Sequence, residues 1–126
     1  MKMIDETKKI MEDDGMKITA TTIRVPVYRS HAESVNVEFE GEVTVEEARK
    51  AISNFKGAKV VDDPDEMLYP MPLFTSGKDD VEVGRIRKDE SIEHGLNLWV
   101  CGDQIRKGAA LNALQIVEYM IENNMI

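Results

Sequence analysis

Strand-type and helix-type hydrophobic patterns alternate along this chain, and this alternation is what most restricts its fold. Lys17–Tyr28, with the sequence KITATTIRVPVY, is rich in β-branched residues and predicts a long strand. Within Ser34–Glu40, Val35 and Val37 share one face, which predicts a half-buried strand antiparallel to the first. Three further strands are predicted, at Lys59–Val61, Val81–Lys88 and Leu96–Cys101.

Three segments carry apolar residues at helical spacing. Ile4–Asp13 predicts a first helix, with Gly15 as its candidate C-cap. Thr44 and Glu47 have the spacing of a capping box, and an apolar stripe follows them. The strongest helical pattern covers the tail from about Gln104 to Asn123.

These elements follow the order helix, two strands, helix, three strands, helix. That order predicts an α+β fold with a mostly antiparallel or mixed sheet and helices packed on one face. At 126 residues the chain has the length of a single domain, 1–126. Asp62–Lys78 contains three of the four prolines, and an irregular segment this long is usually functional or a contact surface.

Composition excludes several classes of function. Sixteen basic residues against twenty-four acidic ones give a net charge of −8, which disfavours binding to nucleic acid or to an anionic membrane surface. A single cysteine forms no internal disulfide, and the start of the chain lacks the pattern of a secretory signal, so a cytoplasmic location is expected. The longest apolar runs fall well short of the roughly 20 residues that cross a bilayer.

Arg24–Ser34, with the sequence RVPVYRSHAES, is the first candidate for chemistry. The guanidinium of Arg24 offers a planar fork for a carboxylate or phosphate, and the imidazole of His31 transfers protons near neutral pH. The alternative is that the arginines pair with acids and His31 caps a turn. Arg24 and His31 have opposite parity in a strand, so a shared site requires a bulge or bend near Pro26.

Two further groups of cations are candidates for binding an anion. Asp103 is a predicted N-cap, and Arg106 and Lys107 then fall near a first helical turn, where the helix dipole disfavours cations. An anion or a partner's acids would compensate them, unless they are simply solvated. Arg85 and Arg87 share a strand face, where they either clamp an anion or form salt bridges.

The histidines and the cysteine do not have metal-ligand spacing. His31, His94 and Cys101 form no Cys-x-x-Cys or His-x-x-x-His pair, so no metal site is expected. Cys101 ends an apolar strand and is expected to be a small buried hydrophobe, although a nucleophilic pair with His31 stays open.

Three motifs in one order carry a family resemblance: RVPVYRSHAESV, GRIRKD and LNLWVCGDQIRKGAALNALQIVE. With the opening KMIDETKKI, they resemble the C-terminal part of aspartate-β-semialdehyde dehydrogenase across essentially the whole chain. The resemblance implies a GAPDH-like C-terminal domain. It also implies an enzyme that reduces L-aspartyl-4-phosphate with NADPH, through a cysteine thioester, and releases phosphate and the semialdehyde.

The same resemblance implies roles for four residues. His31 matches the acid/base histidine, and Arg24 matches the arginine that binds the substrate's α-carboxylate. Lys2 matches a lysine that helps hold the phosphate, and Gln104 lies where the family approaches the nicotinamide end of NADP. The family implies no metal.

The chain departs from the family in what it lacks. It has no Gly-rich dinucleotide fingerprint, and Cys101 does not match the nucleophilic cysteine. A substrate-binding glutamate would fall just before Met1. We therefore expect the substrate-binding and dimerisation domain of a longer enzyme, inactive alone, whose partner is an N-terminal nucleotide-binding domain. A homodimer or homotetramer is expected, and the last helix must find a cover for its apolar face.

Other classes of function stay open. A stand-alone dimeric small-molecule-binding module fits the composition and element order equally well, and a structural or interaction protein is a third possibility. The related acetylglutamyl-phosphate reductases share the chemistry. The pairing of Arg24 with His31 favours an enzyme, because a pure binding module has no need of it.

Overall fold

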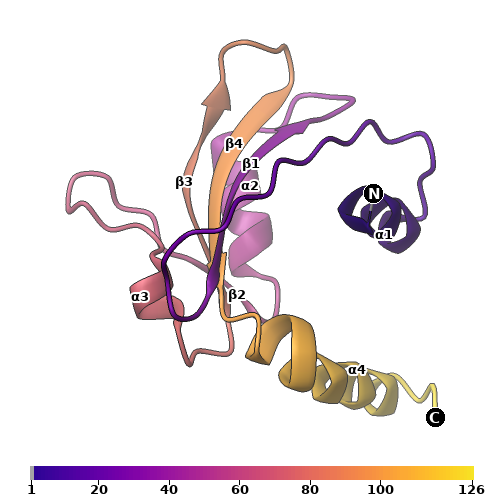
Figure 1. The fold of residues 1–126 in the computed structure, drawn as a ribbon. Coiled ribbons are helices and arrows are strands. Elements are labelled where there is room, and N and C mark those ends of the chain that lie inside the picture. The colour runs from indigo at the N-terminus through magenta and orange to yellow at the C-terminus, as the bar shows by residue number, and fades with distance from the viewer. Residues whose placement is uncertain (1) are drawn as a thin grey trace.

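A computed structural model describes residues 2–126; Met1 lies outside the described residues. The elements are built around one sheet; in Figure 1 both terminal helices, α1 and α4, lie on the right, away from the sheet, and a long unpaired segment leads from α1 to β1. In chain order the elements are α1 (Lys2–Met11), β1 (His31–Glu38), α2 (Val45–Ser53), β2 (Ala58–Val60), α3 (Pro72–Thr75), β3 (Val81–Asp89), β4 (Gly95–Gly102), the irregular turn η1 (Arg106–Ala110) and α4 (Leu111–Glu122).

The sheet has four strands in the order β1-β4-β3-β2. β4 pairs antiparallel with both β1 and β3, whereas β2 pairs parallel with β3. The expected α+β class with a mixed sheet is therefore confirmed. Val35 and Val37 of β1 are half-buried and their neighbours are exposed, which confirms the predicted alternation.

Helix α2 begins with the predicted capping box. The Thr44 hydroxyl accepts the Glu47 backbone N–H at 3.2 Å, and the Glu47 carboxylate accepts the Thr44 N–H at 2.9 Å. These two hydrogen bonds satisfy donors that the first helical turn leaves free. The Thr44 N–H and the Thr44 hydroxyl both donate to the Glu47 carboxylate and hold its pKa below its usual value. The helix packs beside β2 and β3, and Arg49 pairs with the buried Asp62.

The core lies between β3 and β4. Its buried apolar side chains are Val83, Ile86, Leu96 and Cys101. Asp62 shapes β3 beside this core, because its carboxylate accepts the backbone N–H groups of Arg85 at 2.8 Å and Ile86 at 3.0 Å. Those hydrogen bonds stabilise a bulge at which the register with β4 shifts and Arg85 adopts a positive φ of 54°.

The predicted strand at Lys17–Tyr28 is wrong. The segment is extended, but it forms no ladder, and β1 pairs antiparallel with β4 instead. The Val27 N–H bonds to the Val25 carbonyl at 2.9 Å, which makes a tight turn around Pro26. β propensity alone does not make a strand, because a strand also needs backbone partners, and this segment pairs with neither open edge of the sheet.

Two helix boundaries also differ from prediction. The first helix ends at Met11, and Glu12, with φ of 54°, takes the left-handed position that was expected of Gly15. The last helix begins at Leu111 and not at Gln104, because non-helical backbone from Lys107 to Ala109 interrupts the pattern. No helix among residues 2–126 is long and apolar enough to cross a membrane.

Candidate functional site

A cavity of about 250 Å³ opens where β1 begins and β4 ends. His31 is the first residue of β1 and pairs with Gly102, the last residue of β4. The register therefore brings His31 close to Gln104, two residues beyond that pair. The lining residues are His31, Glu33, Val81, Val100, Gly102, Asp103, Gln104, Lys107 and Gly108. Two of the four predicted site residues, His31 and Gln104, thus share one cavity.

Backbone geometry directly before His31 sets how that residue enters the sheet. Ser30 is buried and has φ of 77°, a left-handed conformation that serine rarely adopts. With the turn at Pro26, this confirms the irregularity predicted between Arg24 and His31. Ser30 Oγ lies 3.0 Å from Ser76 Oγ, so the end of α3 holds this bend in place.

Gln104 lines the cavity and carries an unpaired polar atom. Its side-chain Oε1 is buried and accepts no hydrogen bond among the described residues. A buried carbonyl oxygen without a donor is costly to leave unsatisfied. A bound group with an N–H donor would satisfy this oxygen.

Asp103 lies between Gly102 and Gln104 in the sequence and is fully buried. Burial would raise its pKa, but backbone N–H groups of Gly77 and Ile105 and the Arg29 guanidinium together hold the pKa below its usual value. Its expected N-cap role is met in part. The carboxylate accepts the Ile105 N–H at 3.0 Å, yet the turn that it caps leads into η1 and not directly into α4.

Arg24 and Lys2 lie outside this cavity. Arg24 is exposed on the unpaired segment, and Lys2 is exposed on α1, where its Nζ lies 3.6 Å from Glu6 Oε1. The described residues therefore bring His31 and Gln104 together but not Arg24 or Lys2. The roles predicted for Arg24 and Lys2 stay predictions.

The other candidate cations have partners within the chain. Arg106 pairs with Asp79, which raises the pKa of the guanidinium, and Lys107 Nζ donates to Gln115 Oε1 at 2.7 Å. Both residues precede α4, which begins at Leu111, so neither lies in its first turn as predicted. Arg85 lies over the Tyr69 ring at 5.7 Å from its centroid, a cation–π contact.

Cys101 is a core residue, as expected. It is fully buried in β4, and burial together with the negative charge of Glu82 raises the pKa of its thiol to about 11. A nucleophilic cysteine needs a lowered pKa, so the alternative pairing of Cys101 with His31 as a nucleophile is excluded on physical grounds.

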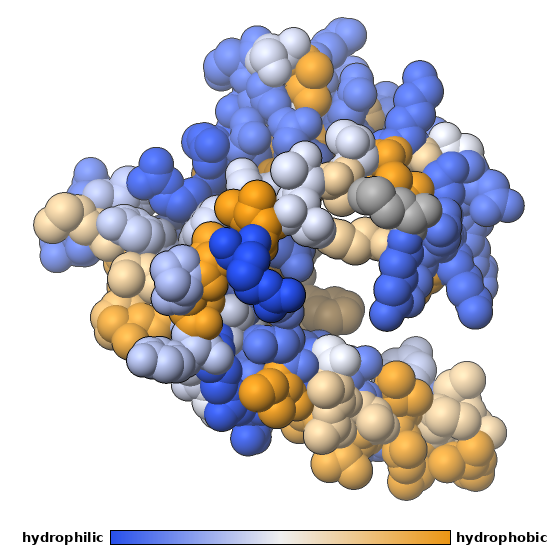
Figure 2. Space-filling model, in the orientation of Figure 1, coloured by the Kyte–Doolittle hydropathy of each residue, from blue (hydrophilic) through white to orange (hydrophobic). Residues whose placement is uncertain are grey.

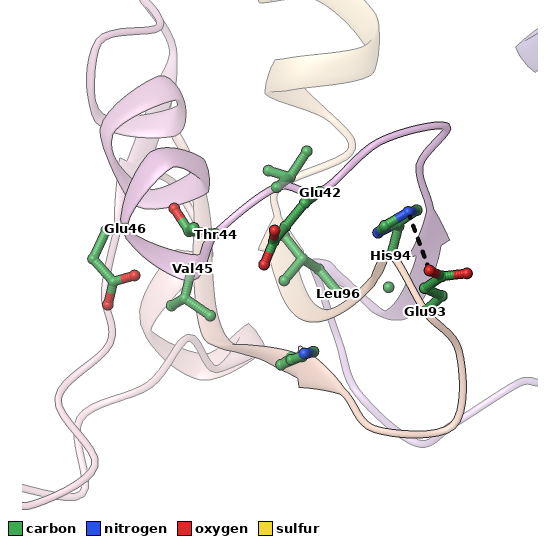
Figure 3. Close-up of a pocket in the computed structure, with 10 residues that line it drawn as sticks. Glu42, Thr44, Val45, Glu46, Glu93, His94 and Leu96 are labelled. Atoms are coloured by element: carbon green, nitrogen blue, oxygen red, sulfur yellow. Dashed lines mark ion pairs between the residues drawn. The ribbon is translucent and has the colours of Figure 1, made fainter.

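A second cavity, of about 210 Å³, lies at the opposite end of β4, near Gly95 (Figure 3). Glu42, in the loop before α2, and Glu46, in the first turn of α2, line it, and His94 Nε2 lies 4.0 Å from Glu93 Oε1. None of the predicted site residues lines it. Within residues 2–126, no three His, Cys, Asp or Glu side chains are grouped to hold a metal ion.

The fold is that of a known class of domain. Residues 1–107 match the family model described as "Semialdehyde dehydrogenase, dimerisation domain". The chain belongs to the aspartate-semialdehyde dehydrogenase family and corresponds to its C-terminal dimerisation domain. The predicted family is thereby confirmed.

Named relatives give the extent of the match. The chain is 55% identical over 121 residues to aspartate-semialdehyde dehydrogenase from Prochlorococcus marinus, covering 96% of this chain and 35% of the relative. The Synechocystis enzyme is 52% identical over 126 residues, covering 100% of this chain and 37% of the relative. The chain thus spans about a third of the length of these curated relatives.

Solved structures agree with the fold. Aspartate semialdehyde dehydrogenase II from Vibrio cholerae, complexed with ASA, superposes with a TM-score of 0.88 at 39% identity, covering 96% of this chain and 35% of that one. The enzyme from Candida albicans, solved with NADP, has a TM-score of 0.64 at 25% identity, covering 82% of this chain and 33% of that one.

Proposed function

We propose that this chain supplies the acid/base part of an aspartate-semialdehyde dehydrogenase. The enzyme would reduce L-aspartyl-4-phosphate to L-aspartate 4-semialdehyde with NADPH and release phosphate, a step towards lysine, methionine and threonine. The observation that supports this most directly is the shared cavity of His31 and Gln104. The alternative of an acetylglutamyl-phosphate reductase domain has no comparable support, since the relatives above are aspartate-semialdehyde dehydrogenases.

His31 is the proposed proton carrier. Its ring is exposed at the cavity, so a thiol and substrate supplied from outside residues 1–126 have access to it. The imidazole takes the proton of that thiol, which attacks the acyl phosphate and displaces phosphate to form a thioester. It then protonates the departing sulfur after reduction.

Gln104 is proposed to orient the nicotinamide through its unpaired Oε1. NADPH, when bound, supplies the hydride. Most of its binding surface is proposed to come from a nucleotide-binding domain outside this chain.

Arg24 and Lys2 are proposed to hold the α-carboxylate and the phosphate of the substrate. Both roles require the unpaired segment and α1 to lie against the cavity in the assembled enzyme, because their side chains lie outside it here.

Two measurements test this function. This chain alone is expected to show no NADPH-dependent turnover of L-aspartyl-4-phosphate, and adding the nucleotide-binding domain in trans is expected to produce it.

In the complete enzyme, His31→Asn is expected to lower kcat by about 10²–10⁴-fold, the usual contribution of a positioned acid/base, and to leave the melting temperature unchanged. His94→Asn is the matched control, because the chain's other histidine lies at the second cavity. Turnover by this chain alone, or a His31→Asn rate within twofold of wild type, would refute the proposal.

A further inference from the structure

Asp103, one of the residues that line the cavity, joins three segments at one carboxylate. One oxygen, Oδ2, accepts the Gly77 backbone N–H at 2.6 Å and lies 2.6 Å from Arg29 Nε. The other, Oδ1, accepts the Ile105 N–H at 3.0 Å. Arg29 stands two residues before His31, and Ile105 directly follows Gln104. The carboxylate therefore ties the segment leading to His31 to the turn that carries Gln104.

Charge, more than hydrogen-bond alignment, holds the Arg29 contact. Arg29 Nε lies close to Asp103 but makes no well-aligned hydrogen bond. The Asp103 side chain is 0% exposed and that of Arg29 is 38% exposed. A buried carboxylate is stable only when its charge is compensated, so removing either partner leaves an unfavourable group at the cavity.

A second contact joins two of the same segments. Ser76 Oγ donates to the Pro72 carbonyl of α3 at 2.7 Å and lies 3.0 Å from Ser30 Oγ, within hydrogen-bond distance of the bend before His31. Ser30 holds the left-handed conformation described above. Strained backbone of this kind persists only where neighbouring contacts fix it, and the neighbours here are Ser76 and the Asp103 carboxylate.

We propose that Asp103 is a positioning residue for the reaction: with Arg29 and Gly77 it fixes the spacing between His31 and Gln104. This inference rests on the proposed function. The lowered pKa of Asp103 agrees with it, because the carboxylate stays ionised across the neutral range. Misplacement of reacting groups by about 1 Å costs up to roughly 10²-fold in rate, so a remote tie of this kind has a measurable effect.

The test uses the complete enzyme and substitutions on both partners. Asp103→Asn keeps the volume and removes the charge; kcat is expected to fall about 10–100-fold while the KM for NADPH stays within twofold. Arg29→Ala is expected to lower kcat about tenfold, with partial recovery in millimolar guanidinium, and Arg29→Lys to be less impaired. Arg29 is partly exposed, so these variants remain informative if Asp103→Asn does not fold.

Arg106→Ala is the matched control, since Arg106 is also a partly exposed arginine paired with an aspartate, Asp79. It is expected to keep wild-type kcat. A second measurement follows the ring signal of His31 in enzyme with 13C-labelled histidine, assigned by its loss in His31→Asn. The signal is expected to move in Asp103→Asn and Arg29→Ala and to stay in place in Arg106→Ala.

The possible results separate the two proposals. The positioning role is overturned if both Asp103→Asn and Arg29→Ala turn over within twofold of wild type, or if their lost rate equals their lost folded fraction with the His31 signal unmoved. If the wild-type enzyme does not reduce L-aspartyl-4-phosphate, the proposed function is refuted; movement of the His31 signal in Asp103→Asn and Arg29→Ala would then still show that these two residues fix the His31 ring.

Discussion

At the scale of single residues, surroundings decide which groups are chemically active. Cys101 and His31 illustrate this contrast: the thiol is fully buried in the core, whereas His31 is exposed at the cavity. The sequence correctly indicates a buried Cys101, because it ends an apolar strand. It does not reveal that Arg29 pairs with a buried acid, since the partner Asp103 lies 74 positions further along the chain.

Cys101 provides a prediction at this scale. With a thiol pKa of about 11, only about one molecule in a thousand carries the thiolate at pH 8, so iodoacetamide reacts slowly until the protein unfolds. Because the folded pKa is raised, the stability that the protonated thiol contributes is present below about pH 8.5 and is lost as pH rises towards 11.

The measurement is mass spectrometry after timed alkylation, in buffer and in denaturant. Cys101→Ala in the complete enzyme should keep kcat within about twofold and lower stability by about 1 kcal/mol. Rapid alkylation of the folded protein at pH 8, or a large loss of kcat in Cys101→Ala, would show that the thiol is reactive.

At the scale of elements, hydrogen-bonding partners decide what local propensity leaves open. The capping box at Thr44 is a local signal, and the helix forms where it predicts. Lys17–Tyr28 has strong β propensity, yet it pairs with neither of the two open edges of the sheet, those of β1 and β2. The bulge in β3 likewise depends on Asp62, a residue outside the strand that no strand pattern indicates.

Gly84, in β3, provides a prediction at the scale of elements. A Cβ there would collide with the Val61 carbonyl oxygen and come within 2.6 Å of Pro70 Cδ. Because the first of these atoms belongs to the backbone, relief requires β3 to separate from its neighbour. Gly84→Ala is therefore expected to lower the free energy of unfolding by about 1–3 kcal/mol.

Thermal or denaturant unfolding of the complete enzyme measures this cost. Gly41→Ala is the control, because nothing lies within 4 Å of the Cβ position at Gly41 and its φ is not positive. Equal stability of the two variants would contradict the close packing of β3 against Val61.

At the scale of the whole molecule, the uncovered apolar surface is the dominant feature. Helix α4 extends away from the sheet (Figure 1), and apolar side chains line it in Figure 2. Leu114 is 63% exposed and Ile121 is 59% exposed, values that are unusual for a packed helix. The unpaired segment adds Ile23 at 80% exposure. Both features are consistent with a domain that is built to assemble.

Self-association is the prediction at this scale. At micromolar concentration the chain is expected to form a homodimer or homotetramer, because burial of apolar surface drives such assembly. Sedimentation velocity measures it, and dilution separates dimer from tetramer. The Leu114→Glu variant tests whether α4 forms part of the interface between copies. An oligomer that persists in this variant would place the interface outside α4. A strictly monomeric wild-type chain would contradict the prediction.

The sequence alone determined the fold class, the capped helix α2, the strands β2, β3 and β4, and the family through its three motifs. These features depend on residue spacing within a few turns or a single strand, so the local pattern contains them. Tertiary structure alone decided that Lys17–Tyr28 stays unpaired, that His31 meets Gln104 across the β1–β4 register, and that Asp103 holds Arg29. Those outcomes depend on which distant segments meet, and a linear pattern does not record that.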